Sequence, residues 1–376
     1  EGVMTLPVKE KERTVLRCGC PVRCALIAAG AIVTALYFIT RSNRDVMLAV
    51  SDGIVRPYHT LMGRLCSLFP FSVAELIYAA GIIAAVVYTA WCVRSAVHGL
   101  PLPAVLRRWI ITAAAVFITF FGGICLLWGV FYYSFDFADL SGLERRDVSV
   151  TELEEATRMF AQLANEYAPL VERDAALTYT ADAGDILGRA PEAFEGAVDV
   201  FQFLDGAMLE PKAMLLSEIM SAMNFTGFFF PFTGEANINV NAPDCFIPCT
   251  AMHEISHQRG IAPEDEANFI AVLACLESGD AEFIYSGALF AYLHLGNALY
   301  KASPEAYHDV AATLCGEARA DLDANNSYWA SRDTEAAAIS ESVYTGFLYT
   351  QGDERGLQSY GACTDLLVAY YLEEGL

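Results

Sequence analysis

Basic charge is scarce in this chain of 376 residues: 23 Lys and Arg stand against 46 Asp and Glu, and the formal net charge is −23. Such an acidic balance argues against nucleic acid as a partner, because phosphate contacts need Lys and Arg side chains. Charge of either sign is also sparse, at 18% of residues, whereas 55% are apolar. A typical soluble domain has about 25% charged and about 45–50% apolar residues. This apolar content excludes disorder, and the composition is not that of one ordinary soluble domain.

The charge is divided unevenly along the chain. Residues 1–131 carry twelve Lys or Arg and six Asp or Glu, whereas residues 132–376 carry eleven and forty. The sequence therefore predicts two parts, a membrane anchor over residues 1–135 and an acidic domain over residues 136–376. Neither part contains an internal repeat or a low-complexity linker.

Long apolar runs dominate the first part, over about residues 24–40, 74–93 and 109–131. About 20 helical residues cross the hydrocarbon layer of a bilayer, so these runs predict three transmembrane helices. A fourth uncharged run, Phe283–Tyr300, contains polar residues and has acidic flanks. We expect it to be a buried helix of the domain.

Basic residues set the predicted orientation. Five precede the first span and three lie between the second and third: Lys9, Lys11, Arg13, Arg17 and Arg23, then Arg94, Arg107 and Arg108. Because positive residues near spans stay cytoplasmic, we expect a multi-pass protein of the cell membrane with a cytoplasmic N-terminus and an extracytoplasmic domain. Four basic residues in the first external loop oppose this orientation: Arg41, Arg44, Arg56 and Arg64. That loop is amphipathic over residues 46–65, and we expect it to lie on the membrane interface with a break at Pro57.

The domain is predicted to be mostly α-helical with a small β element. Thr151–Glu154 has the pattern of a capping box, and Pro191 and Pro211 are each predicted to open a helix. Further helices are predicted to begin at Ser303 and to cover residues 334–350 and 357–372. The one predicted strand covers residues 235–240. The five cysteines of this part are an odd number, and Cys245 and Cys249 are expected to be buried thiols or a local disulfide.

The chemistry is concentrated in the segment His253-Glu-Ile-Ser-His257, an HExxH motif. Residues at positions i and i+4 share a helix face, so His253 and His257 can present two imidazoles to one metal ion. Glu254 is expected to act as the general base, as in zinc proteases with this motif. Pro248 lies near the start of this helix, and Gly260 is where the chain should leave it.

A third ligand is expected from the next helix, which Pro263 opens. Glu264 is the predicted ligand, because the short connection brings the first turn of this helix towards His257. Asn268 lies four residues further on the same face and is expected to hydrogen-bond the ligand. Glu266 is the rival and points about 200° away around the helix. The predicted cofactor is Zn²⁺, although the same ligands also suit other metals.

Longer motifs resemble an uncharacterised bacterial family of membrane proteins with three N-terminal spans and an outer HExxH domain. The matching segments are Thr233–Asn239, His253–Ala262 and Glu264–Phe269, with shorter blocks at Tyr285–Gly287, Tyr328–Trp329 and Ser359–Gly361. That family is similar to zincin metallopeptidases of the glutamate-ligand kind. In those enzymes Glu-x-x-Ala-Asp/Asn carries the third ligand at its first position, which corresponds to Glu264 here. This chain departs from most of them in having only six residues between His257 and Glu264.

The resemblance implies a peptidase-like fold, and the motif predicts a membrane-anchored zinc peptidase that cleaves peptide bonds outside the cell membrane. Its partners would be a peptide or protein substrate and the lipid bilayer, with the oligomeric state left open. The strand over residues 235–240 is expected to pair with an extended peptide. Four residues are possible oxyanion donors: Tyr285, His294, Tyr328 and Tyr360. The aromatic run Phe225–Phe232 either lines the substrate groove or packs against the membrane-proximal core.

Two other functions remain open. One is a catalytically inactive zincin-fold module that binds peptides or acts as a sensor, and the other is a membrane scaffold with an incidental HExxH segment. Cleavage inside the bilayer is disfavoured, because the motif has polar neighbours and lies more than a hundred residues beyond the third span.

Overall fold

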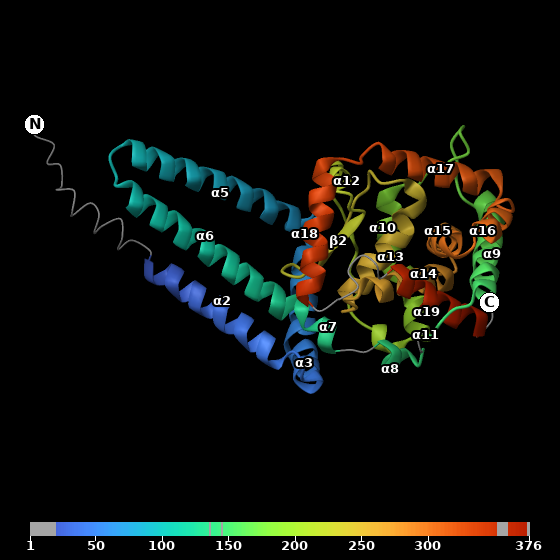
Figure 1. Cartoon of the computed structure of the whole chain (residues 1–376), viewed down its shortest axis with the longest axis horizontal. Coiled ribbons are helices and arrows are strands. Elements are labelled where there is room, and N and C mark those ends of the chain that lie inside the picture. The colour runs from blue at the N-terminus through green and yellow to red at the C-terminus, as the bar shows by residue number, and fades with distance from the viewer. Residues whose placement is uncertain (1–19, 135–136, 144–145, 352–359, 374–376) are drawn as a thin grey trace, which may run out of the picture.

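The computed structural model describes residues 20–134, 137–143, 146–351 and 360–373. Three long helices project from a helical domain that contains a small sheet, so the predicted fold class is confirmed (Figure 1). The basic residues Lys9, Lys11, Arg13 and Arg17 lie outside the described residues, as does the beginning of the helix predicted over 357–372.

The three projecting helices are long and apolar enough to cross a bilayer, so this is a membrane protein. They are α2 (Cys20–Thr40), α5 (Val73–Val97) and α6 (Leu102–Ile124). The third span continues through a π-helical turn, η2 (Cys125–Gly129), into α7 (Phe131–Ser134). It therefore reaches the domain without a break.

The segment between the first two spans is helical throughout: α3 (Arg44–Val50), the π-helical turn η1 (Ser51–Val55) and α4 (Arg56–Cys66). The predicted break at Pro57 is wrong. Pro57 lies in the first turn of α4, where its missing N–H costs little. This segment also packs against the domain, because Tyr58 Oη donates to the Phe232 carbonyl at 2.8 Å.

The domain begins with short and medium helices: α8 (Phe137–Ser141), α9 (Val150–Tyr167), η3 (Ala168–Leu170), α10 (Ala183–Ala193), α11 (Glu195–Val200), η4 (Gln202–Leu204) and α12 (Ser217–Ala222). Three predictions need correction here. The capping box of α9 is Ser149 with Glu152, two residues before the predicted one. Pro191 lies inside α10, which begins earlier because the Asp182 side chain caps it. Pro211 precedes a strand instead of opening a helix.

The sheet has the order β1-β3-β2, with β1 (Lys212–Ala213), β2 (Gly227–Phe230) and β3 (Glu235–Ile238). β3 pairs with β1 in parallel and with β2 in an antiparallel hairpin. The predicted strand over 235–240 thus exists in a shorter form, but it is the central strand. Because both of its edges are occupied, the expected pairing of this strand with a substrate peptide is wrong.

The remaining helices form the core: η5 (Asp244–Phe246), α13 (Ile247–Gln258), α14 (Glu264–Glu277), α15 (Ala281–Ala302), α16 (Pro304–Ala311), α17 (Gly316–Ala330), α18 (Glu335–Gln351) and α19 (Tyr360–Glu373). α15 is buried among α9, α13, α14 and α19, as predicted for the uncharged run Phe283–Tyr300. Ser303 caps α16, also as predicted. Cys245 and Cys249 are buried free thiols, so there is no local disulfide between them.

The domain holds the start of α5 with carboxylates. Glu235 of β3 accepts hydrogen bonds from the backbone N–H groups of Val73 and Ala74, at 3.0 and 2.9 Å. In return, Glu75 of α5 accepts from the backbone N–H groups of Leu215 and Leu216. Free N–H groups at a helix start favour a negative partner, so these bonds fix the second span to the sheet.

The α2–α6 pair provides a test of how the anchor is packed. A Cβ atom at Gly122 would lie 2.8 Å from the Gly30 carbonyl oxygen, so the two backbones touch. We expect Gly122→Leu to lower the free energy of unfolding by about 1–3 kcal/mol, measured by thermal unfolding in nanodiscs. The control is Gly81→Leu, because a Cβ atom at Gly81 of α5 would meet nothing within 4 Å. Equal destabilisation by both substitutions would contradict this packing.

Candidate metal centre

The HExxH motif lies on α13, as predicted. Pro248 stands in the first turn of this helix, and the chain leaves it at Gly260 with a φ of +89°. A side chain at Gly260 would be strained by that backbone conformation, and its Cβ would meet the Phe131 ring at 2.8 Å. The exit is therefore fixed both by backbone conformation and by the membrane-proximal end of the third span.

The turn after Gly260 brings the next helix back onto the motif. α14 begins at Glu264, whose carboxylate lies 3.2 Å from His253 Nε2 and 3.6 Å from His257 Nε2. One donor atom from each of these three side chains lies within 4.8 Å of the others. Within the described part of the chain, no other group of three His, Cys, Asp or Glu residues meets in this way, and Glu266 is not part of the group.

The orientation of His257 is set by its second ring nitrogen. Nδ1 lies 2.7 Å from the Ile261 carbonyl oxygen, which can only accept, so Nδ1 carries a proton and Nε2 is the nitrogen that faces Glu264. The Trp128 ring packs edge-on against the same imidazole, with ring centroids 5.3 Å apart. Histidines that ligate metals are commonly held by such a carbonyl contact.

The electrostatics of the cluster also suit a cation. Burial disfavours a charged Glu264, yet His257 and His253 hold the pKa of this carboxyl well below its usual value. Burial likewise opposes a proton on His257, but Glu264 raises the pKa of this imidazole to about 9. Glu264 and His257 thus share a proton in a largely buried space. A metal cation could replace the shared proton, so the donor set fits Zn²⁺.

Glu254 lies beside the cluster without joining it. Its side chain is buried, and Oε2 has no hydrogen-bond partner among the described residues. Burial raises the pKa of Glu254 to about 7. Gly227, the first residue of β2, lies against this carboxylate, because a Cβ atom there would come within 2.5 Å of Oε1. The arrangement presents a carboxylate whose protonation can change near neutral pH.

Tyr344 of α18 was not singled out from the sequence. Its hydroxyl donates a hydrogen bond to Glu264 Oε1, and its ring packs edge-on against Phe225. Asn268 was expected to bond Glu264, but the bond that the structure describes comes from Tyr344. A helix over 334–350 could be predicted from the sequence, whereas no local pattern indicated which of its residues faces the motif.

Three of the four possible oxyanion donors have described side chains, and one of them, His294, interacts electrostatically with His253 of the cluster. Burial, together with the charge of His253, lowers the pKa of His294 to about 4. Tyr285 instead donates to Asp321, and Tyr328 shares a hydrogen bond of 2.6 Å with Ser221. The side chain of Tyr360 lies outside the described residues.

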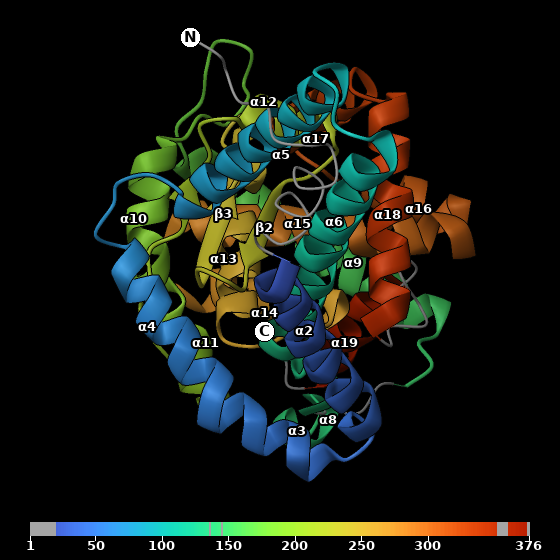
Figure 2. The same cartoon turned by 90° about the vertical axis from the view of Figure 1, so that its left-hand side faces the viewer.

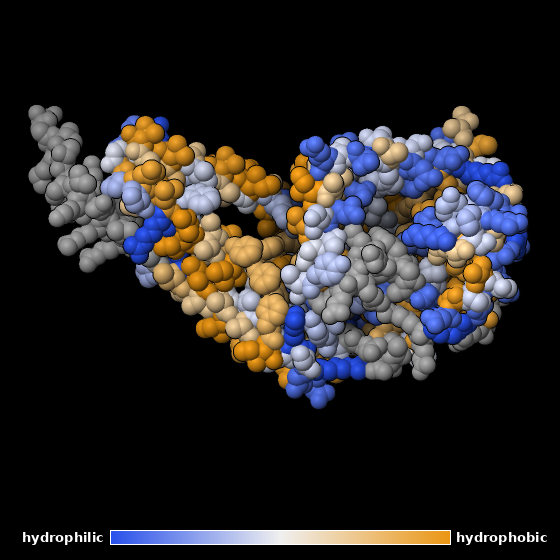
Figure 3. Space-filling view, viewed as in Figure 1, coloured by the Kyte–Doolittle hydropathy of each residue, from blue (hydrophilic) through white to orange (hydrophobic). Residues whose placement is uncertain are grey.

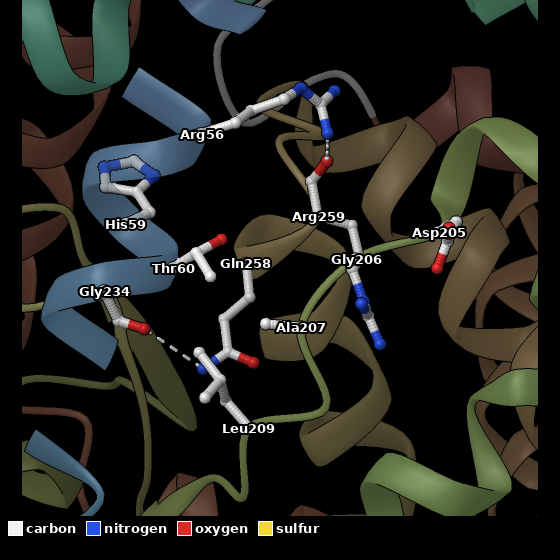
Figure 4. A pocket seen from close by; sticks show the side chains of 10 residues that line it. All are labelled: Arg56, His59, Thr60, Asp205, Gly206, Ala207, Leu209, Gly234, Gln258 and Arg259. Atoms are coloured by element: carbon white, nitrogen blue, oxygen red, sulfur yellow. Dashed lines mark hydrogen bonds between the residues drawn. The ribbon is translucent and has the colours of Figure 1, made fainter. Parts of the chain in front are cut away.

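A cavity of about 80 Å³ lies at the C-terminal end of α13, where α4 meets the domain (Figure 4). Arg56 Nη1 donates to the Arg259 carbonyl at 2.7 Å, and Gln258 Nε2 donates to the Gly234 carbonyl at 3.2 Å. The first bond fixes the C-terminal end of the HExxH helix to α4, and the second fixes it to the β2–β3 turn.

The comparisons with known proteins identify the family of this chain, but the description of that family names no activity. The family model described as "Protein of unknown function (DUF3810)" matches residues 51–368, which is most of the chain. No curated protein and no solved structure matches. The similarity to zincins therefore stays a prediction, whereas the length of the family match is sufficient to place the chain. This protein belongs to the family described as protein of unknown function DUF3810.

Proposed function

We propose that this protein is a membrane-anchored, zinc-dependent metallopeptidase of the glutamate-ligand kind that acts on the extracytoplasmic side. The observation that carries this proposal is the convergence of His253, His257 and Glu264, with the buried carboxylate of Glu254 beside them. Three protein ligands are typical of catalytic zinc sites, in which the fourth position is kept for water or substrate. Zinc supplies Lewis acidity and lowers the pKa of water towards about 7.

Glu254 would act as the general base and then as the general acid of the reaction. Its carboxylate accepts a proton from the water that attacks the carbonyl carbon and passes that proton to the leaving amine nitrogen. The pKa of about 7 for the buried side chain suits both steps near neutral pH. Tyr344 holds Glu264 in place through its hydroxyl.

A substrate peptide would pair with β2 instead of β3. Among the described residues β2 pairs only with β3, so its other edge is free, and three of its four residues are partly exposed. An extended peptide added to this edge would run beside Gly227, against which Glu254 lies. The edge strand thus replaces the predicted central strand as the substrate platform.

The orientation also belongs to this proposal. Arg94, Arg107 and Arg108 lie around the turn between α5 and α6, at the ends of the spans far from the domain (Figure 1). Two of the opposing basic residues are engaged by the protein itself: Arg41 lies over the Phe38 and Tyr133 rings, and Arg56 donates to the Arg259 carbonyl. Both observations support a cytoplasmic turn and an external domain.

Metal content tests the ligand assignment. We expect about one zinc ion per chain in the purified protein, and little zinc in His253→Ala, His257→Ala or Glu264→Ala, because each substitution removes one of three ligands. Metal analysis of each variant gives the readout. Glu266→Ala is the matched control on the first turn of α14 and should keep its zinc. Loss of zinc in Glu266→Ala but not in Glu264→Ala would reverse the assignment.

Glu254→Gln tests the catalytic role separately from metal binding. The amide keeps the size of the side chain but cannot accept the proton, so we expect peptide cleavage to fall by about 10²–10⁴-fold while the zinc content stays unchanged. Cleavage of a peptide library, measured by mass spectrometry beside metal analysis, gives the readout. Equal activity of the two proteins would exclude this mechanism. Zinc binding without any cleavage by the wild type would favour the peptide-binding or sensory alternative.

Tyr344→Phe tests the support of the third ligand. Removing the hydroxyl that donates to Glu264 should weaken zinc affinity by about 10–100-fold, as for other groups that hold a metal ligand. Competition with a chelator measures this affinity. Tyr349→Phe is the control, because Tyr349 lies on the same helix and is more than half exposed. Unchanged affinity in Tyr344→Phe would show that Glu264 is positioned without this bond.

A further inference from the structure

The candidate metal centre lies at the end of the third span, although more than a hundred residues separate the two in the sequence. Trp128 in the π-helical turn η2 contacts the imidazole of His257. The same indole packs against Phe229 of β2, with ring centroids 5.2 Å apart. A membrane-spanning helix therefore forms part of the wall of the site.

The other face of β2 lies against the spans as well. Phe228 and Phe230 contact Tyr78 of α5, with ring centroids 6.1 and 5.0 Å apart. At the end of the strand, Phe232 stacks on Phe120 of α6 at 5.1 Å. The aromatic run therefore packs against the membrane helices. Seen from the side of the spans, β2 and β3 lie between α5 and α6 (Figure 2).

The two spans that flank β2 diverge as they approach it. The hydrogen bonds described between them join the halves far from the domain, at Tyr88 with Thr112 and at Trp109 with Thr89. Nearer the domain, large apolar side chains of both helices are exposed, including Ile82 at 65% and Phe117 at 68%. The space-filling view shows a gap between the two helices that widens towards the domain (Figure 3). We call this gap the α5–α6 wedge.

Apolar side chains are also exposed on the domain on both sides of the two spans. Leu215, Leu216 and Ile219 are exposed around the start of α12. The backbone N–H groups of Leu215 and Leu216 donate to Glu75 at the start of α5. On the α18 side, Ile339 and Val343 are 65% and 68% exposed. A soluble domain seldom exposes such residues together, whereas a surface continuous with membrane spans exposes them to lipid.

We propose that the α5–α6 wedge receives a transmembrane helix of the substrate, whose adjoining extracytoplasmic segment extends along the free edge of β2 into the metal centre. This inference rests on the proposed function and names its substrate class: membrane-anchored polypeptides, cut close to the membrane surface. The wedge opens to lipid, offers apolar side chains, and ends at the strand whose first residue touches Glu254. A free soluble peptide would use only the last of these features.

The test uses the full-length, zinc-loaded protein in nanodiscs with three substrates that share one cleavable sequence. The first carries this sequence directly after a single apolar helix, the second has a flexible spacer of about ten residues, about 33 Å of extended chain, between them, and the third replaces the helix by an acyl chain. The acyl version controls for the concentrating effect of the membrane. We expect the first to be cleaved at least about tenfold faster than the other two, at a fixed distance from its helix. Equal rates for all three would overturn the inference and leave the proposed function standing.

Binding is measured independently of cleavage with the Glu254→Gln protein. A photo-crosslinker in the middle of the substrate helix should label α5 and α6, and peptide mapping identifies the labelled residues. Labelling of the exposed face of α2 instead would overturn the proposal that the α5–α6 wedge binds the substrate helix. If α5 and α6 are labelled but the wild type cleaves none of the substrates, the wedge is supported and the proposed hydrolysis is wrong.

Discussion

The arrangement of the domain depends on a largely buried carboxylate that is held between two imidazoles. A charge in such a place is costly unless a partner of opposite sign lies within a few ångströms. Glu264 meets this condition only because α13 ends at Gly260 and the chain returns at once into α14. The neighbouring elements are set around this pair of helices: Trp128 covers His257, β2 covers Glu254, and α18 supplies the hydroxyl that bonds Glu264. A change that shifts one helix against the other therefore exposes or isolates a buried charge.

Much of this structure could be predicted from local sequence patterns, and the predictions that failed share one cause. The apolar runs predicted the spans, the spacing of His253 and His257 predicted that they share a helix face, and Gly260 predicted the end of that helix. Each prediction succeeded because it depends only on residues that are close together in the sequence. Pro191 and Pro211 misled, since proline at the first turn is only a preference and the Asp182 cap and the sheet decided those regions. The contacts of Tyr344 with Glu264 and with Phe225 join segments about 80 and 120 residues apart. The periodicity of a local stretch of sequence does not indicate such long-range contacts.

The membrane anchor and the domain are joined at several places by buried or partly buried polar contacts instead of by a flexible linker. Glu235 and Glu75 bind the start of α5 and the loop before α12, while Arg56 and Tyr58 of α4 bind the end of α13 and the β2–β3 turn. Since unsatisfied buried polar groups cost more than the bonds themselves contribute, separating the two parts would break several bonds together. The position of the candidate metal centre relative to the membrane-spanning helices is consequently a fixed property of the fold.

The unbroken helical course from Leu102 to Ser134 has a consequence for bilayer thickness. Its 33 residues measure about 50 Å, longer than the roughly 30 Å of hydrocarbon in an average membrane. The last turns of this helix are buried against the domain, and the remainder is long enough to cross the bilayer with some tilt. Tilting this helix moves Trp128, and with it His257, relative to the lipid headgroups. The length of the lipid acyl chains sets the bilayer thickness and hence this tilt. It therefore determines which segment of a membrane-anchored substrate lies at the height of the two imidazoles. In this respect the third span sets the distance of the site from the membrane as well as anchoring the protein.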